Sequence, residues 1–282
     1  MKNVGYYNGE IAPLEELKIP ALDRSVYFGD GVYDVAFIHN RKPVALEDHL
    51  NRFFNSCKLL KIDIDKTKDE MEQIFLSIID HSDEDETDFI LYWQMTRGVA
   101  LRNHVFPESA KPSLFAYITP KKIGDQSKKV KLLTQEDNRF YLCNIKTINL
   151  IPNVLASEAA KQAGCDEAVL HRGEIVTEGS HTSILIIKDG KVITHPLSNL
   201  ILPSITRMHV LNICKENGIP CEERQFTLDE LFDADEVMIA STTTVLLAAN
   251  EIDGKPVGGK APALLRSIQD AAVRDFETAT NA

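Results

Sequence analysis

The sequence lacks paired cysteines, long apolar runs and an excess of basic charge. Its five cysteines are scattered without a C-x-x-C pair, which predicts reduced thiols and a cytoplasmic protein. The first residues, MKNVGYYNGE, contain no apolar stretch of the kind found in secretory signals, and the longest uncharged run near the C-terminus, residues 237–250, is too short to span a bilayer. The net charge of −11 argues against nucleic-acid binding, because a phosphate backbone requires a basic surface.

The bulk composition is that of an ordinary soluble globular protein. Hydrophobic residues make up 44% and charged residues 26% of the 282 positions. A chain of this length can form two domains and bury a large core, so neither a disulfide nor a metal site is needed or expected. No internal repeat or low-complexity segment interrupts it.

The first part of the chain predicts short strands followed by helices. VGYYNGEI and VYDVAFIHNRKPVAL each hold a polar turn between apolar pieces. The apolar spacing from Glu47 onward predicts an amphipathic helix, and a second helix is expected at Lys68–Asp80 with Thr67 as its N-cap. DFILYWQMTRG and SLFAYITP are typical of buried strands.

A polar segment, TPKKIGDQSKK, predicts a linker between two domains. It has no apolar periodicity and collects Pro, Gly and Lys residues. We therefore expect a small N-terminal domain at residues 1–120, a linker at 121–129 and a larger domain at 130–282.

The larger domain is predicted to mix helices with a strand meander. A strand is expected at Lys129–Thr134, and a helix at about Asn153–Gln162 that ends at Gly164. EAVLHR, EIVTEG and TSILIIKDGKVITHP then form a meander with an Asp-Gly hairpin turn. Ser204 begins a further helix that Gly218 ends, and residues 237–250 are interpreted as a buried strand that leads into a polar loop. The fold class is therefore α+β.

One lysine, Lys146 in YLCNIKTINL, lies among apolar neighbours. Burial disfavours the ammonium form and makes the amine usable as a nucleophile or Schiff-base partner. The alternative is a lysine at a strand end whose amine reaches water, and local sequence alone favours that alternative.

Three further segments are candidates for binding a ligand. Glu178 in TEGS could keep a ring nitrogen protonated, LPSITR places Ser204 and Thr206 at a helix start suited to phosphate, and STTT (241–244) adds hydroxyl groups. Each has a plainer interpretation: a solvated turn glutamate, an ordinary helix cap and a polar loop.

Four residues of the first half are candidate site residues, one facing a cleft and three suited to binding anions. The turn in FGDGVYDV presents Tyr33, Arg52 lies on the apolar-rich helix, and LRNHVFP places Arg102 two residues before His104 in a loop, where the pair could hold a carboxylate. Tyr33 could equally pack within the sheet, and Arg52 could lie on the polar face of its helix.

Taken together and in this order, from FGDGVYDV to STTT, the motifs resemble the fold-type IV pyridoxal-phosphate enzymes, a family of class IV aminotransferases and related lyases. The resemblance covers nearly the whole chain. It implies a two-domain enzyme with a β-barrel-like core in the larger domain, and pyridoxal 5′-phosphate at the domain interface. LRNHVFP makes the likeness strongest to the D-amino-acid aminotransferases.

The resemblance also implies roles for individual residues. Lys146 is the Schiff-base lysine and moves the Cα proton, and Glu178 is the partner of the ring nitrogen. Leu202 supports the ring from below, and Arg139 organises its oxygen side. The phosphate is expected to be held by Arg52, Ile205, Thr206 and Thr242.

On the substrate side, the resemblance implies that Tyr33, Arg102 and His104 bind the α-carboxylate. The Arg-x-His loop of the family is supplied by the neighbouring subunit, so an obligate homodimer is expected. Three positions depart from the family pattern: Ser183 where an Asn is usual, Ser204 where a Gly is frequent, and His181 where a small hydroxyl residue is common. These departures bear on the substrate side.

The expected reaction is transamination between a D-amino acid, such as D-alanine or D-glutamate, and a 2-keto acid. The alternatives are an L-branched-chain aminotransferase or an aminodeoxychorismate lyase on the same scaffold, and a protein that binds the cofactor without turnover.

Overall fold

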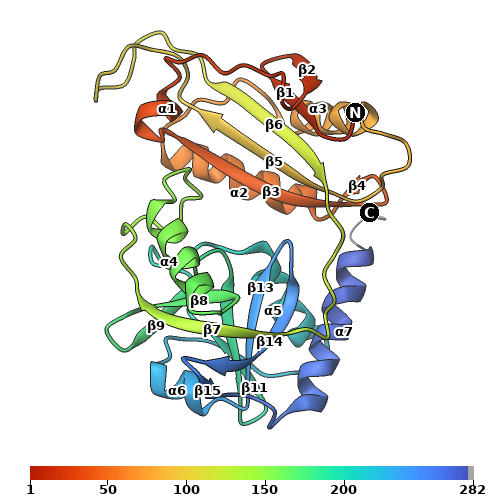
Figure 1. Ribbon diagram of the computed structural model, residues 1–282, viewed down its shortest axis with the longest axis vertical. Coiled ribbons are helices and arrows are strands. Elements are labelled where there is room, and N and C mark those ends of the chain that lie inside the picture. The colour runs from red at the N-terminus through yellow and green to blue at the C-terminus, as the bar shows by residue number, and fades with distance from the viewer. Residues whose placement is uncertain (279–282) are drawn as a thin grey trace. The chain divides into compact units, whose positions relative to one another are not determined.

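The computed structural model describes residues 1–278 and divides them into two compact units (Figure 1). Unit 1 consists of Met1–Lys122 and the short segment Ile145–Asn149. Unit 2 consists of Ile123–Asn144 and Leu150–Thr278. The domain boundaries predicted at residues 120 and 130 stay a prediction, because compactness alone does not show that either part folds independently.

Unit 1 is built on a six-stranded antiparallel sheet in the order β2-β1-β6-β5-β3-β4. Alternate residues of its central strand are buried, as the period of two in a strand requires for a sheet with one covered face. The strands are β1 (Val4–Tyr7), β2 (Glu10–Pro13), β3 (Gly31–His39), β4 (Lys42–Pro43), β5 (Phe89–Thr96) and β6 (Ser113–Pro120).

Two helices cover the apolar face of this sheet (Figure 1). Helix α2 (Leu46–Leu59) packs on β3, and helix α3 (Lys68–Asp80) packs on β1 and β6. Thr67 and Glu70 form a capping box at the start of α3, which satisfies backbone N–H groups that the helix itself cannot bond. The core between the layers is centred on Phe53, Phe75 and Trp93, all fully buried.

A third, very short helix lies immediately before the FGDG turn. Helix α1 (Arg24–Phe28) ends at Gly29, whose left-handed φ of 59° suits a residue without Cβ. Gly31 then begins β3, where a Cβ would lie 2.7 Å from the backbone oxygen of Met95. The predicted tight turn is confirmed, whereas α1 was not predicted.

Segment Ile145–Asn149 belongs to unit 1 although both flanking segments belong to unit 2. It lies along β3, since the Tyr33 N–H donates to the Lys146 oxygen at 2.9 Å and the Ile148 N–H donates to the Gly31 oxygen at 3.2 Å. A bridge between Val32 and Thr147 continues this pairing. The lysine backbone is therefore fixed to the strand that carries Tyr33.

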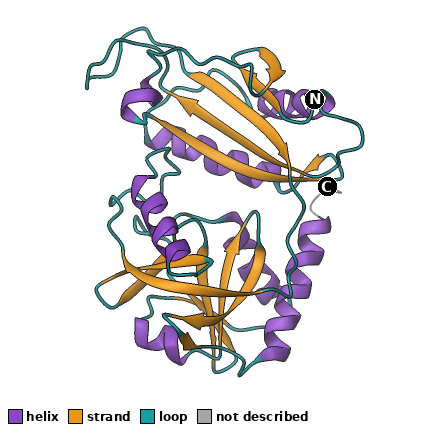
Figure 2. Cartoon of the chain, in the orientation of Figure 1, coloured by secondary structure: helices purple, strands orange, loops and turns teal. Residues whose placement is uncertain are grey.

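Unit 2 contains a nine-stranded mixed sheet in the order β12-β11-β10-β13-β14-β7-β8-β9, with β15 beside β14. The strands curl (Figure 2), which agrees with the barrel-like expectation, and their largest described apolar cluster includes residues of β7, β10, β13 and β14. They are β7 (Lys129–Glu136), β8 (Glu167–Arg172), β9 (Ile175–Gly179), β10 (Ser183–Lys188), β11 (Lys191–Thr194), β12 (Cys221–Glu223), β13 (Glu236–Ser241), β14 (Val245–Ile252) and β15 (Lys255–Pro256).

Four helices complete unit 2. Helix α4 packs on β7 and β8, α6 on β9, α5 on β13, and α7 on α5 and β14. Within residues 1–278, no helix is long and apolar enough to cross a membrane. The four helices are α4 (Ile151–Gln162), α5 (Ile205–Glu216), α6 (Leu228–Asp233) and α7 (Pro262–Thr278).

The α+β class and most predicted elements are confirmed. The Ser204 side chain accepts from the Arg207 N–H at the start of α5, and Gly164 and Gly218 follow α4 and α5 with positive φ. The interpretation of residues 237–250 as a buried strand that leads into a polar loop is confirmed for β13 and the STTT turn, but it missed the strand that follows the turn. The run contains β13, a turn and the start of β14, because hydroxyl-rich STTT joins two apolar strands in an antiparallel pair.

Candidate active site

Lys146 presents its amine to the tyrosine ring of the neighbouring strand. Its Nζ lies 4.3 Å from the centre of the Tyr33 ring, a cation–π contact, and the side chain is half-buried. The Lys146 N–H donates to Ser56 Oγ of α2 at 3.3 Å. Sheet and helix thus hold the backbone of Lys146 from both sides, and its role as the Schiff-base residue stays a prediction.

Arg52 is buried and already bonded to a carboxylate of its own unit. Its Nε donates to Asp34 Oδ2 at 2.8 Å and its Nη2 donates to Asp34 Oδ1 at 2.6 Å, a bidentate pair. His49 Nδ1 lies 2.8 Å from the same Oδ1. The polar-face alternative for Arg52 is therefore wrong, since only 9% of the residue is exposed.

In the cluster of Asp34, His49 and Arg52, the pKa shifts favour an ionised aspartate and a neutral histidine. Burial alone raises the pKa of Asp34, but the Arg52 charge and the His49 hydrogen bond outweigh it and hold the pKa well below its usual range. Burial also lowers the pKa of His49. Asp34 therefore fixes the guanidinium of Arg52 in one orientation.

Arg102 and His104 lie on an exposed loop and share one aromatic neighbour. The Arg102 guanidinium is 5.1 Å from the Phe28 ring centre, and the His104 ring centre is also 5.1 Å from it. The loop is anchored by Arg24, whose Nη1 donates to the Asn103 oxygen at 2.7 Å and whose Nε donates to Asp30 Oδ2 at 2.7 Å. The structure thus places the two residues predicted to bind a carboxylate, Arg102 and His104, next to the same phenylalanine, Phe28.

In unit 2, Glu178 is a buried carboxylate at the end of β9. The Leu202 N–H donates to both of its oxygens at 3.1 Å, and Arg139 Nη1 donates to Oε1. The solvated-turn interpretation of Glu178 is wrong, because only 6% of the residue is exposed. Gly179 has a reason within the fold itself, since a Cβ there would overlap Thr182 Oγ1.

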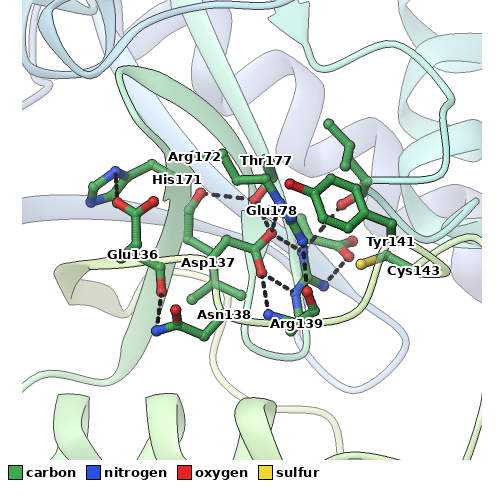
Figure 3. A network of polar contacts seen from close by, with 12 residues as sticks. Glu136, Asp137, Asn138, Arg139, Tyr141, Cys143, His171, Arg172, Thr177 and Glu178 are labelled. Carbon is green, nitrogen blue, oxygen red and sulfur yellow. Dashed lines mark hydrogen bonds and ion pairs between the residues drawn. The ribbon is translucent and has the colours of Figure 1, made fainter.

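Arg139 lies between two carboxylates, as Figure 3 shows. It was expected on the oxygen side of a cofactor, a role that stays a prediction. The contacts shown here are with Glu178 and Asp137, and Arg172 and Thr177 bond to Asp137 as well. Burial raises the pKa of Glu178, and Arg139 opposes that rise without cancelling it.

The two candidate phosphate-binding segments, the start of α5 and the STTT turn, belong to neighbouring elements, because the turn follows β13 and β13 packs against α5. Ile205 and Thr206 occupy the first turn of a 12-residue helix whose N-cap is Ser204. Helix α5 packs on β13, and β13 leads directly into the turn that holds Thr242. A helix N-terminus and hydroxyl groups are the donors that a phosphate requires.

The two departures near Glu178 have structural partners. His181 Nδ1 lies 2.9 Å from Oε2 of the buried Glu167. Ser183 begins β10 and pairs with Ala240 of β13. The third departure, Ser204, preserves the helix start by capping it.

Sequence reasoning missed the carboxylates Asp34 and Asp137. Asp34 had a signal, because it shares the inward face of β3 with Val32 and Ala36, and a buried carboxylate requires a cation. Asp137 directly follows β7 and carried no comparable pattern.

Comparison with known proteins identifies the family to which the chain belongs. Residues 31–252 match the family described as amino-transferase class IV. The D-alanine aminotransferase of Bacillus licheniformis is 37% identical over 94% of this chain and 94% of its own length. The chain belongs to the class IV aminotransferases.

Solved structures of this family share the fold of the whole chain. The branched-chain aminotransferase from Thermoproteus uzoniensis, solved with norvaline, covers 97% of this chain and 95% of its own with a TM-score of 0.88 and 22% identity. The branched-chain amino acid aminotransferase from Escherichia coli covers 98% of this chain and 95% of its own with a TM-score of 0.88 and 21% identity.

As a class IV aminotransferase, the chain depends on pyridoxal 5′-phosphate. Its residues fit that group. Glu178 is a buried carboxylate that suits a cationic ring nitrogen, and Lys146 offers a half-buried amine. Arg52 and the start of α5 supply donors for an anion.

Proposed function

We propose that this aminotransferase moves an amino group between a D-amino acid, such as D-alanine or D-glutamate, and a 2-keto acid, such as pyruvate or 2-oxoglutarate. The observation that carries the proposal is the near full-length similarity to D-alanine aminotransferases at 35–37% identity. The placement of Arg102 and His104 on one loop supports it.

Two rivals on the same scaffold are the L-branched-chain aminotransferases and the aminodeoxychorismate lyases. Branched-chain enzymes occur among the similar structures, but at the 21–22% identity of the two described above that likeness concerns the fold alone. A protein that binds the cofactor without turnover is the rival of another class. The motif LRNHVFP favours the D-amino-acid transaminase, because it contains Arg102 and His104, the two residues assigned to the substrate carboxylate.

We further propose roles in cofactor binding for individual residues of each unit. When bound, pyridoxal phosphate supplies an electron-withdrawing ring that stabilises the carbanion formed at Cα. Lys146 holds it covalently and then carries the proton removed from Cα. Glu178 keeps the ring nitrogen protonated, and Leu202 contacts the ring while its N–H orients Glu178.

The phosphate is assigned to four residues. Arg52, oriented by Asp34, supplies charge, and the backbone N–H groups of Ile205 and Thr206 supply the helix N-terminus. Thr242 adds a hydroxyl group from the turn after β13.

We propose that Tyr33, Arg102 and His104 hold the substrate carboxylate, and that the latter two serve the active site of a second copy in a homodimer. Around Arg102 the loop exposes apolar side chains, with 78% of Leu101 and 69% of Val105 accessible. Such exposure favours burial against another chain. A cytoplasmic location, expected from the unpaired thiols, stays a prediction.

The direct test of the activity incubates purified protein with each amino-acid donor and 2-oxoglutarate and measures the 2-keto acid formed. D-alanine and L-alanine give pyruvate, and L-leucine gives 4-methyl-2-oxopentanoate. For aminodeoxychorismate, the pyruvate released is measured. We expect turnover with D-alanine and far slower turnover with L-alanine, L-leucine or aminodeoxychorismate. Faster turnover with L-leucine would favour the branched-chain enzyme, and absence of turnover with any donor would favour a binding protein.

The carboxylate assignment is tested with Arg102→Ala. Because the exposed arginine contributes little to packing, we expect a folded protein with a strongly raised KM for D-alanine. Unchanged kinetics would refute the assignment. Mixing Arg102→Ala with Lys146→Ala protein tests the shared site: hybrids regain the lower KM of the wild type if the loop serves the neighbouring subunit, and keep the raised KM if it serves its own.

A further inference from the structure

A cluster of polar side chains in unit 2 is centred on Asp137 (Figure 3). Arg139 connects this centre to the carboxylate of Glu178. The Asp137 side chain is completely buried. Its Oδ1 accepts from the backbone N–H of Arg139 at 3.0 Å and from Arg139 Nε at 2.9 Å. Its Oδ2 accepts from Arg139 Nη2 at 2.8 Å, from Arg172 Nε at 3.2 Å and from Thr177 Oγ1 at 3.1 Å. No part of this carboxylate is left to bind a ligand.

Arg139 is consequently fixed in one orientation, with Nη1 directed at Glu178. Its Nη2 also donates to the Leu200 oxygen at 3.2 Å, so neighbouring chain segments hold the guanidinium on several sides. Arg172, whose guanidinium lies 4.2 Å from the Tyr141 ring centre, donates to the Arg139 oxygen at 2.9 Å. The arginine is therefore preorganised before any ligand binds.

The charges of the cluster balance: two carboxylates, Asp137 and Glu178, face two guanidiniums, Arg139 and Arg172. The nearby Cys143 thiol stays neutral, because burial raises its pKa. Burial also raises the pKa of Glu178, and the Arg139 charge is the largest influence that lowers it. The ionised state of Glu178 therefore depends on Arg139.

We propose that Arg139, held by Asp137, is a positioning residue that keeps the Glu178 carboxylate ionised and aimed at the cofactor. The inference rests on the proposed role of Glu178 opposite the ring nitrogen. A single proton is shared between that nitrogen and the carboxylate. Arg139 touches the carboxylate directly, so its charge lowers the proton affinity of Glu178 more than that of a base beyond it. The proton then resides on the nitrogen.

The test measures the ¹⁵N chemical shift of the ring nitrogen in full-length holoenzyme that carries labelled pyridoxal phosphate. In the wild type we expect the shift of a protonated ring. Arg139→Gln removes the cation, and the shift should move toward that of neutral pyridine. Arg139→Lys keeps the charge and should stay closer to the wild type.

Two further variants separate positioning from general damage. Asp137→Asn weakens the hold on Arg139 and should move the shift in the same direction by a smaller amount. Arg224→Gln removes an arginine of the same unit that pairs with Glu222 and Glu230, and it should leave the shift unchanged.

A fully protonated ring nitrogen in Arg139→Gln would overturn the proposal. If that variant does not fold, an unchanged shift in Asp137→Asn overturns it, and a moved shift supports it. Glu178→Gln distinguishes this failure from that of the proposed function. If Glu178→Gln leaves the ring protonated, the role of Glu178 itself is wrong. If it changes the shift while Arg139→Gln does not, only the role of Arg139 is wrong.

Discussion

Each unit contains an arginine whose side chain is largely buried and bonded to a buried carboxylate, and the two pairs use these partners in opposite ways. In unit 1, Asp34 orients Arg52, and the arginine is the residue assigned to the cofactor. In unit 2, Arg139 contacts Glu178, and the carboxylate is the residue assigned to the cofactor. The same chemical pair can therefore prepare a cation for phosphate or an anion for a ring nitrogen.

The two carboxylates differ in how well the fold stabilises their charge. Burial acts against ionisation in both cases. Asp34 receives two bonds from Arg52 and one from His49, and its pKa falls. Glu178 shares Arg139 with Asp137, and its pKa rises above the ordinary 4.5. The charge of Glu178, the carboxylate assigned to the cofactor, therefore lowers the stability of the fold, whereas the charge of Asp34, which orients Arg52, raises it.

The two shifts also have opposite signs in the dependence of stability on pH. The pKa of Asp34 is lower in the folded state, so its contribution is present above the ordinary value of 3.8 and is lost as the pH falls through the folded pKa. The pKa of Glu178 is higher in the folded state. Its contribution is present below 4.5 and is lost as the pH rises through the folded pKa.

The largest expected effect is that of Asp34→Asn. The substitution leaves Arg52 buried without its counter-ion, so the free energy of unfolding should fall by about 3–5 kcal/mol. Urea denaturation of the cofactor-free protein at neutral pH measures it. Asp270→Asn, which breaks only an exposed pair with Arg266, is the control and should cost less than about 1 kcal/mol. If Asp34→Asn lowered the free energy of unfolding by as little as the control does, the contrast between the Asp34–Arg52 pair and the Glu178–Arg139 pair would be lost.

The next effect concerns Arg52 as the phosphate ligand. In Arg52→Gln, the preference for pyridoxal phosphate over pyridoxal should fall roughly 10- to 100-fold, as expected for the loss of charged hydrogen bonds. Both affinities are measured by titrating the full-length cofactor-free chain, with Arg224→Gln as the control. If the affinities for pyridoxal phosphate and pyridoxal fell by the same factor, Arg52 would affect binding only by stabilising the structure and not by contacting the phosphate.

The smallest effect on stability is expected for Glu178→Gln. A neutral amide ends the cost of burying charge, and Arg139 keeps Asp137 as its partner, so the free energy of unfolding at neutral pH should stay within about 1 kcal/mol or rise. The wild type and the variant should converge below pH 4.5, where glutamate is protonated. A loss as large as that of Asp34→Asn would contradict the assignment.

Local signals in the sequence predicted most of the fold. Thr67 and Ser204 marked the starts of α3 and α5, because side-chain caps act within one turn of a helix. The Asp-Gly pair marked the hairpin of β10 and β11. The pairing of Ile145–Asn149 with β3 was not predicted, since contacts between distant segments leave no local pattern.

The candidate site was predictable to the extent that its residues lie in motifs. Lys146 was singled out by its apolar neighbours and Glu178 by its position before Gly179, and the resemblance supplied their expected roles. The residues that orient the site were not found. Asp34 meets Arg52 across two elements, and Asp137 meets Glu178 only through Arg139, so their significance depends on the folded arrangement.

The most direct test of the central claim is to locate the cofactor on the chain. Holoenzyme is treated with borohydride, which reduces the bond between cofactor and lysine to a stable amine, and the peptides are then analysed by mass spectrometry. We predict the phosphopyridoxyl mass on the peptide that contains Lys146. Modification of another lysine, with Lys146 unmodified, would contradict the account.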